Sequence, residues 1–122
     1  MKTHSPGFLA LVEDAKSRIQ TIDVPELKRM RESGEPFRLV DVREESEWNA
    51  GHAQGAIHLG KGIIERDIEN TIPGREERIV LYCGGGFRSA LAADNLRKMG
   101  YKNVISLDGG WSEYRDSGLP VE

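Results

Sequence analysis

The segment Leu81-Tyr82-Cys83-Gly84-Gly85-Gly86-Phe87-Arg88-Ser89 joins an apolar run to an amphipathic one, and the interpretation of the whole chain starts from it. Residues 79–82 are the most apolar run in the sequence and predict a buried strand. Residues 88–99 predict a helix whose apolar face carries Leu91, Ala92, Leu96 and Met99. The segment is therefore expected to be a strand end, a glycine turn and a helix start in direct succession.

Helical and strand-like runs alternate along the rest of the chain. Further helices are predicted at residues 6–18, 23–32, 44–50, 62–70 and after Trp111. Further strands are predicted at residues 19–22, 37–42, 56–59 and 104–107. The alternation indicates an α/β fold with a mainly parallel five-stranded sheet that is flanked by helices on both faces. Ligands of such sheets bind at the carboxyl ends of the strands, where the sequence places Cys83.

Composition excludes several classes of protein. A chain of 122 residues suits one domain, and 30% charged with 38% hydrophobic residues is ordinary for a globular one. The 17 Lys and Arg against 20 Asp and Glu leave a net charge of −3, without the basic excess of a nucleic-acid protein. No apolar run approaches the roughly 20 residues that span a bilayer. We therefore expect neither a nucleic-acid nor a membrane partner.

The cysteine count and the first residues bear on the compartment. A single cysteine, Cys83, excludes an internal disulfide and a cysteine-based zinc cage. The apolar run at residues 8–12 is too short for a signal peptide, so a cytoplasmic location is expected. In a reducing compartment, a lone cysteine is either an inert core residue or a chemically used thiol.

The first 20 residues are predicted to stand apart from the rest. We expect an N-terminal helical extension over residues 1–20, followed by one domain over residues 21–122. The extension is expected to cover an edge or a face of the sheet, or to make a dimer contact. His4 is expected to lie in a mobile tail.

Residues 83–89 have the composition of an anion cradle around a thiol. Three consecutive glycines allow several backbone N–H groups to point into one concavity. The helix N-terminus adds partial positive charge, and Arg88 adds a full one. Such a cradle favours the thiolate and binds an anion at the same place, as nucleophilic attack on an anionic substrate requires. The alternative is a cysteine that serves only as a small buried hydrophobe.

Four separated motifs resemble those of the rhodanese family, and they occur in the family's order. Cys83-x4-Arg88 is similar to the family's active-site loop, and residues 39–43 resemble its Asp-Val-Arg strand end. Residues 47–58 resemble its Gly-His segment, and residues 107–111 resemble its closing Gly-Gly-Trp signature. The resemblance extends from about Thr21 to Leu119.

The resemblance implies a single-domain thiosulfate sulfurtransferase that needs no metal or other cofactor. Cys83 would take sulfur from thiosulfate or a persulfide donor and pass it, from a Cys83 persulfide, to cyanide, a thiol or a protein acceptor. Loop N–H groups would stabilise the terminal sulfur, and Arg88 would bind the donor's oxyanion. The substrate-binding residues implied are Gly84, Gly85, Gly86, Phe87, Arg88 and Ser89. The assembly is expected to be a monomer or a homodimer.

Three other functions compete with this one. A protein-to-protein sulfur-relay module would use the same cysteine, and a noncatalytic rhodanese-like binding module would not use it. The third alternative is a phosphatase or arsenate reductase, because related phosphatases carry a loop one residue longer, Cys-x5-Arg. The residue six positions after Cys83 is Ser89, so the loop length disfavours this reading.

Supporting roles are open for four polar residues. Asp41, at a strand end, is expected to hydrogen-bond the active-site loop or Arg88, or else to be a helix N-cap or form a local turn. Arg43 is expected to add positive field at the site, or to pair on the surface with Glu44, Glu45 or Glu47. His52 and His58 are interpreted as structural residues.

Overall fold

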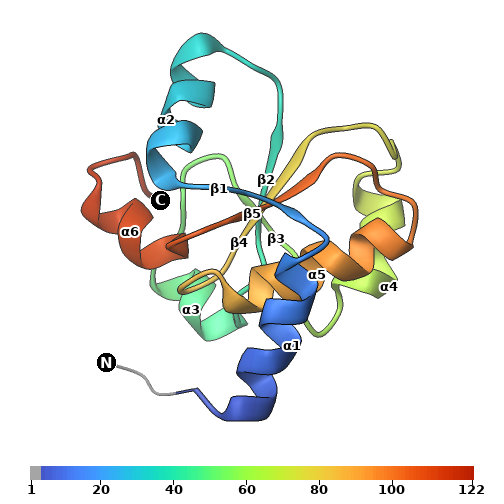
Figure 1. Ribbon diagram of the computed structural model, residues 1–122. Coiled ribbons are helices and arrows are strands. Elements are labelled where there is room, and N and C mark those ends of the chain that lie inside the picture. The colour runs from blue at the N-terminus through green and yellow to red at the C-terminus, as the bar shows by residue number, and fades with distance from the viewer. Residues whose placement is uncertain (1–3) are drawn as a thin grey trace.

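The computed structural model describes residues 4–122 and builds one five-stranded sheet between two layers of helices (Figure 1). The strands are β1 (Gln20–Ile22), β2 (Arg38–Asp41), β3 (Ile57–His58), β4 (Ile79–Tyr82) and β5 (Val104–Leu107). They are ordered β1-β5-β4-β2-β3, and every neighbouring pair is parallel. The predicted α/β class and five-stranded parallel sheet are confirmed.

Six helices accompany the sheet within the described residues. They are α1 (Pro6–Lys16), α2 (Val24–Ser33), α3 (Glu45–Ala50), α4 (Ile64–Thr71), α5 (Phe87–Lys98) and α6 (Gly110–Asp116). Helices α4 and α5 cover one face of the sheet, and α2 and α6 cover the other, as the two sides of Figure 1 show. None of these helices is long and apolar enough to cross a bilayer.

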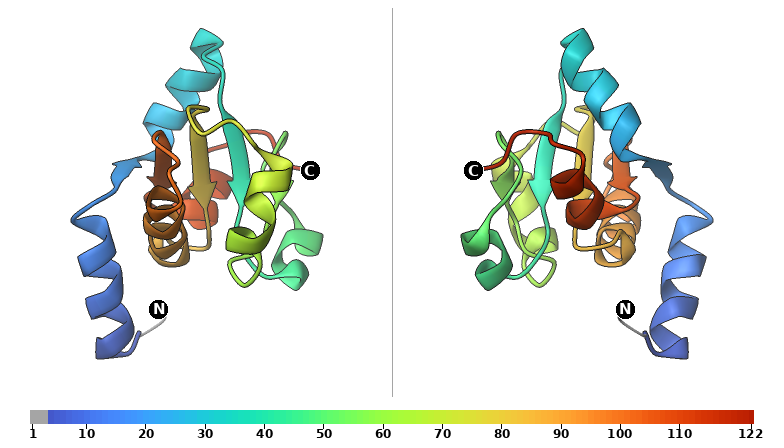
Figure 2. Two further views of the ribbon diagram at one scale, coloured as in Figure 1. Left: turned by 90° about the vertical axis from the view of Figure 1, so that its right-hand side faces the viewer. Right: turned by 90° about the vertical axis from the view of Figure 1, so that its left-hand side faces the viewer.

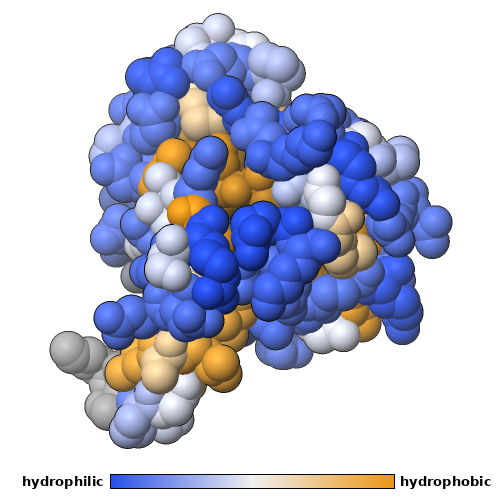
Figure 3. Space-filling view, turned by 45° about the vertical axis from the view of Figure 1, so that its right-hand side comes forward, coloured by the Kyte–Doolittle hydropathy of each residue, from blue (hydrophilic) through white to orange (hydrophobic). Residues whose placement is uncertain are grey.

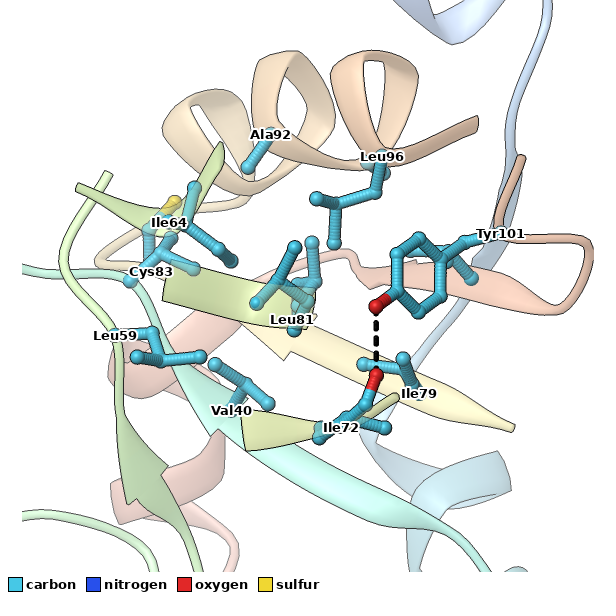
Figure 4. Close-up of a cluster of buried hydrophobic side chains, with 14 residues drawn as sticks. Val40, Leu59, Ile64, Ile72, Ile79, Leu81, Cys83, Ala92, Leu96 and Tyr101 are labelled. Atoms are coloured by element: carbon cyan, nitrogen blue, oxygen red, sulfur yellow. Dashed lines mark hydrogen bonds between the residues drawn. The ribbon is translucent and has the colours of Figure 1, made fainter. Parts of the chain in front are cut away.

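Strand β4 is the centre of the molecule, because all four of its residues are buried between the two helical layers. On one face, Ile79 and Leu81 join the apolar side chains of α4 and α5. Figure 4 shows this cluster, with Cys83 near Ile64 at one end and Tyr101 at the other. The Tyr101 hydroxyl donates a 2.6 Å hydrogen bond to the carbonyl oxygen of Ile72, which closes the far end. The cysteine is therefore fixed by the most deeply packed strand.

The other face of the sheet is sealed by α2 and α6. The side chains of Val80 and Tyr82 point to this face and pack on Leu27 and Tyr114. Helix α2 begins where predicted, because the Asp23 carboxylate accepts a 3.0 Å hydrogen bond from the Glu26 N–H. Both helical layers thus hold β4, and the carboxyl ends of β2, β4 and β5 meet at one edge of the sheet.

Helix α1 packs on α5 and lies outside the two layers, as Figure 2 shows. Val12 and Ala15 are buried in this contact. At its end, Arg18 donates hydrogen bonds of 3.1 and 2.9 Å to the Asp94 carboxylate of α5. Helix α1 therefore covers α5, which itself lies on that face of the sheet, and the expectations of a covered sheet edge or of a dimer contact stay predictions.

The Arg18–Asp94 contact predicts how stability depends on pH. Hydrogen bonds from Arg18 lower the pKa of Asp94 from 3.8 to about 2. A carboxyl group with a lowered folded-state pKa adds stability above its unfolded value, and this contribution disappears as the pH falls from 3.8 toward 2. We therefore expect Asp94→Asn to destabilise the protein most at neutral pH, with the difference from wild type shrinking across that window.

Urea unfolding at steps from pH 7 to pH 2 measures this difference. The matched control is Asp116→Asn, since Asp116 is exposed and pairs with the neighbouring Arg115 on the surface, at 3.5 Å. The control is expected to show a small difference at every pH. A cost of Asp94→Asn that does not change with pH would contradict the assignment.

Candidate active site

The Cys83 thiol lies directly after β4, among polar groups that point at it. Its Sγ atom accepts hydrogen bonds from the N–H groups of Gly86, at 3.2 Å, and Ser89, at 3.4 Å. The thiol itself donates to the Ser89 hydroxyl at 3.5 Å, and that hydroxyl is 2.8 Å from the Ser106 hydroxyl on β5. A negative charge on this sulfur would therefore meet two backbone donors and a hydroxyl.

Two features hold the loop in this shape, namely the backbone conformation of Gly86 and hydrogen bonds from the start of α6. Gly86 has a φ of +98°, in the left-handed region, and a Cβ there would lie 3.3 Å from the Leu107 carbonyl oxygen. The Trp111 N–H donates to the Cys83 carbonyl oxygen at 2.7 Å, and the Ser112 N–H donates to that of Gly84 at 3.2 Å. The closing Gly-Gly-Trp segment thus supports the loop from behind.

A cavity of about 710 Å³ opens above the loop. Its lining residues are His4, Phe8, Glu44, Glu47, Cys83, Gly84, Gly85, Phe87, Arg88 and Ser112. Cys83 as a whole is only 1% exposed, yet it forms part of the cavity floor. The thiol is therefore recessed beneath a cavity that the loop and α1 border.

The guanidinium of Arg88 is occupied by a carboxylate. It donates hydrogen bonds of 2.8 and 3.2 Å to the two carboxylate oxygens of Glu47 on α3. These hydrogen bonds lower the pKa of Glu47 to about 2. They also raise the pKa of Arg88, and Cys83 makes a smaller contribution to the same increase. The proposed anion-binding residue is thus half of an ion pair that the sequence analysis did not predict.

Asp41 and Arg43 form a buried pair beside the site. The Asp41 carboxylate accepts from the Arg43 backbone N–H at 2.8 Å and from its guanidinium at 2.7 Å. Of the arrangements considered for Asp41, the local turn is the one observed, and the carboxylate paired with Arg88 belongs to Glu47. Surface pairing of Arg43 is wrong, because the residue is 3% exposed and its guanidinium lies 4.7 Å from the Trp111 ring centre.

The two strand-side histidines contact other parts of the fold. His52 stacks on Trp48 with ring centres 3.4 Å apart, and its Nδ1 is 3.1 Å from the Trp48 carbonyl oxygen. The Nε2 of His58 is 2.8 Å from the Arg43 carbonyl oxygen, which makes it a donor there. Both placements agree with a structural role.

An aromatic wall forms the other side of the cavity. Phe87 of the loop lies 4.6 Å from His4 and 6.2 Å from Phe8 of α1, measured between ring centres. The His4 ring, for which the sequence predicted a mobile tail, packs against both phenylalanines at the cavity. Figure 3 shows apolar residues gathered at this lower end of the molecule, where Leu9 and Leu11 of α1 are exposed. Helix α1 therefore contributes directly to the site.

The comparisons with known proteins identify the family. The model of the rhodanese-like domain matches residues 23–117, and the chain belongs to that family. A Schizosaccharomyces pombe protein named "Putative thiosulfate sulfurtransferase, mitochondrial" is 36% identical over 89 residues, which are 64% of this chain and 63% of that protein. A Bacillus subtilis protein named "Putative sulfur carrier protein YrkF" is 30% identical over 80% of this chain and 52% of its own length. The chain thus spans about half to under two thirds of these relatives.

Solved structures share the fold over most of the chain. The rhodanese-like domain of an Anabaena protein is 31% identical, covers 84% of this chain and 77% of its own, and superposes with a TM-score of 0.75. A Rhodopseudomonas palustris protein, described as of unknown function and as a possible tyrosine phosphatase, is 30% identical with a TM-score of 0.88. It covers 100% of this chain and 98% of its own, so that protein shares the N-terminal helix as well.

Proposed function

We propose that this protein is a sulfurtransferase that carries sulfur as a persulfide on Cys83. The observation that carries the proposal is the recessed Sγ atom, which accepts hydrogen bonds from the backbone N–H groups of Gly86 and Ser89. A thiolate and the terminal sulfur of a persulfide are both anionic, so the same donors stabilise both. The sulfurtransferase and sulfur-carrier names of the relatives support this chemistry.

The reaction has two half-steps, and the Cys83 persulfide that the first one forms is consumed in the second. The Cys83 thiolate attacks the outer sulfur of thiosulfate, a new S–S bond forms, and the old S–S bond breaks as sulfite leaves with its electron pair. Cyanide or a thiolate then attacks the terminal sulfur of the persulfide and takes it, which returns Cys83 as the thiolate. Charge balances in each step, and no redox partner is required.

Phosphatase activity is the second candidate, because the Rhodopseudomonas palustris neighbour is described as a possible tyrosine phosphatase. Two features of this chain argue against it. Cys83 and Arg88 are five positions apart, one fewer than in the Cys-x5-Arg loops of phosphatases. The Arg88 guanidinium that would hold a phosphate is also paired with Glu47. We therefore favour a sulfur donor over a phosphate ester.

Parallel assays of the same preparation distinguish the two activities. We expect thiocyanate formation from a sulfane-sulfur donor and cyanide, and no Cys83-dependent release of phosphate from an aryl phosphate. Iodoacetamide, which alkylates the thiolate, is expected to abolish thiocyanate formation because Cys83 is the single cysteine of the chain. Phosphate release without thiocyanate would overturn the proposal.

A further inference from the structure

The ion pair between Arg88 and Glu47 controls the charge at the mouth of the cavity. Both carboxylate oxygens of Glu47 accept hydrogen bonds from the Arg88 guanidinium, at 2.8 and 3.2 Å. The two side chains are 31% and 37% exposed, so the pair borders the cavity and is within reach of an entering donor. The contact engages two of the five N–H donors of the guanidinium and balances its charge, so an inorganic oxyanion that bound Arg88 would compete with this carboxylate.

Glu47 is also held in place independently of Arg88. Its carboxylate accepts a 3.0 Å hydrogen bond from the Glu44 N–H, and this reciprocal contact forms the capping box of α3. The carboxylate is therefore fixed at the start of a helix and does not swing freely into solvent. Its negative charge offsets that of the guanidinium, so the pair as a whole does not attract a dianion such as thiosulfate.

The opposite wall of the cavity is suited to an organic group. His4 and Phe8 pack on Phe87, at ring separations of 4.6 and 6.2 Å, and all three residues line the cavity. Aromatic surface of this kind binds apolar and aromatic ligand groups through burial and ring packing. The cavity thus has an apolar aromatic wall on one side. On the other side it has the Arg88 guanidinium, whose charge Glu47 balances.

From these two features, and building on the proposed function, we infer that Glu47 is a specificity-determining residue that favours organic sulfane-sulfur donors over inorganic ones. By balancing the charge of Arg88, it weakens the attraction that this guanidinium would exert on a free sulfonate oxygen. The aromatic wall then favours donors in which an organic group replaces one oxyanion oxygen. Glu47 acts through Arg88 and does not touch the reacting sulfur.

Benzenethiosulfonate and thiosulfate form a matched pair of donors, because a phenyl group replaces one oxygen of thiosulfate. The Cys83 thiolate attacks the outer sulfur of either donor, and benzenesulfinate or sulfite leaves with the electron pair of the broken S–S bond. The persulfide formed is the same in both cases. The second half-step therefore does not distinguish the donors. Because sulfite and benzenesulfinate differ as leaving groups, recognition is measured by how a substitution changes the ratio of the two donors.

The test compares donor kcat/KM for wild type and variants, with cyanide as the acceptor. Wild type is expected to prefer benzenethiosulfonate by roughly tenfold or more. Glu47→Gln keeps the shape and the capping oxygen but removes the charge. It is expected to lower the thiosulfate KM by roughly threefold to tenfold, with kcat and the benzenethiosulfonate KM changed less than about twofold.

Three further variants isolate the cause. Glu45→Gln removes the same charge from an exposed position of α3, and it is expected to leave the kcat/KM of both donors unchanged. Glu47→Asp keeps the charge and is expected to keep the thiosulfate KM near that of wild type. Adding Arg88→Ala to Glu47→Gln is expected to cancel the gain, because the released guanidinium is what binds the oxyanion.

The outcomes separate this inference from the proposed function. Thiocyanate formation with a wild-type preference for thiosulfate, or with a thiosulfate KM that Glu47→Gln does not change, would overturn the specificity role alone. The wild-type measurement needs no folded variant, so it stands even if a substitution unfolds the chain. Absence of Cys83-dependent thiocyanate from both donors would overturn the proposed function itself.

Discussion

Cys83→Ser is expected to reduce thiocyanate formation to the uncatalysed background, a loss of roughly a thousandfold or more. Serine has nearly the same size, and its hydroxyl can accept the hydrogen bonds that Gly86 and Ser89 donate to the sulfur. The fold and the cavity are therefore retained, but a hydroxyl is neither ionised near neutral pH nor able to form a persulfide. The loss would come from the nucleophile and not from the structure.

Unfolding experiments provide the control for this variant. The free energy of unfolding is expected to change by less than about 1.5 kcal/mol, since the new hydroxyl has hydrogen-bond partners. Donor-dependent turnover by a folded Cys83→Ser protein would show that another group carries the sulfur. It would also leave the polar surroundings of Sγ without a catalytic explanation.

Gly110→Ala is expected to be the most disruptive substitution that does not touch a reacting atom. Gly110 is buried at the start of α6, with a φ of +51°. A Cβ there would overlap the Cys83 carbonyl oxygen and lie 2.9 Å from the carbonyl carbon and oxygen of Gly84. These are backbone atoms that cannot rotate away, so the active-site loop would have to move. We expect a loss of about 3 kcal/mol or more in stability, together with most of the turnover.

Gly118→Ala is the matched control for this prediction. Gly118 also has a positive φ, +82°, but it is exposed and a Cβ would meet nothing within 4 Å. It should therefore cost only the backbone strain of about 1–2 kcal/mol and leave turnover unchanged. Urea unfolding and the thiocyanate assay compare the two variants. Equal effects of both substitutions would mean that the contact between α6 and the loop does not position Cys83.

The fold could be predicted because its signals are local. The apolar run at β4, the amphipathic run at α5 and the glycines between them lie within about 20 consecutive residues. Each element follows from a periodicity or a cap that neighbouring residues supply, such as Asp23 at the start of α2. The parallel pairing follows from the alternation of strands and helices, whereas the strand order was not predicted, because alternation alone is compatible with several orders. The position of Cys83 at the carboxyl end of β4 required no long-range information.

The parts that the sequence did not predict depend on contacts between distant residues. Glu47 is 41 positions from Arg88, and its pairing follows only from where α3 lies relative to the loop. The docking of α1 rests on the Arg18–Asp94 contact, which is 76 positions apart, so the place of His4 at the cavity could not be inferred. The sequence offered one signal for Glu47, which is its negative charge within the segment that precedes Gly51-His52. A carboxylate at such a place either caps a helix or pairs with a cation, and Glu47 does both.

The intact mass of the protein after incubation with a sulfane-sulfur donor shows whether Cys83 carries sulfur. Wild type is expected to gain the mass of one sulfur atom, which cyanide removes, and Cys83→Ser is expected to gain nothing. A folded wild-type protein that keeps its original mass with both thiosulfate and benzenethiosulfonate would exclude a Cys83 persulfide, as would an added sulfur that Cys83→Ser also acquires.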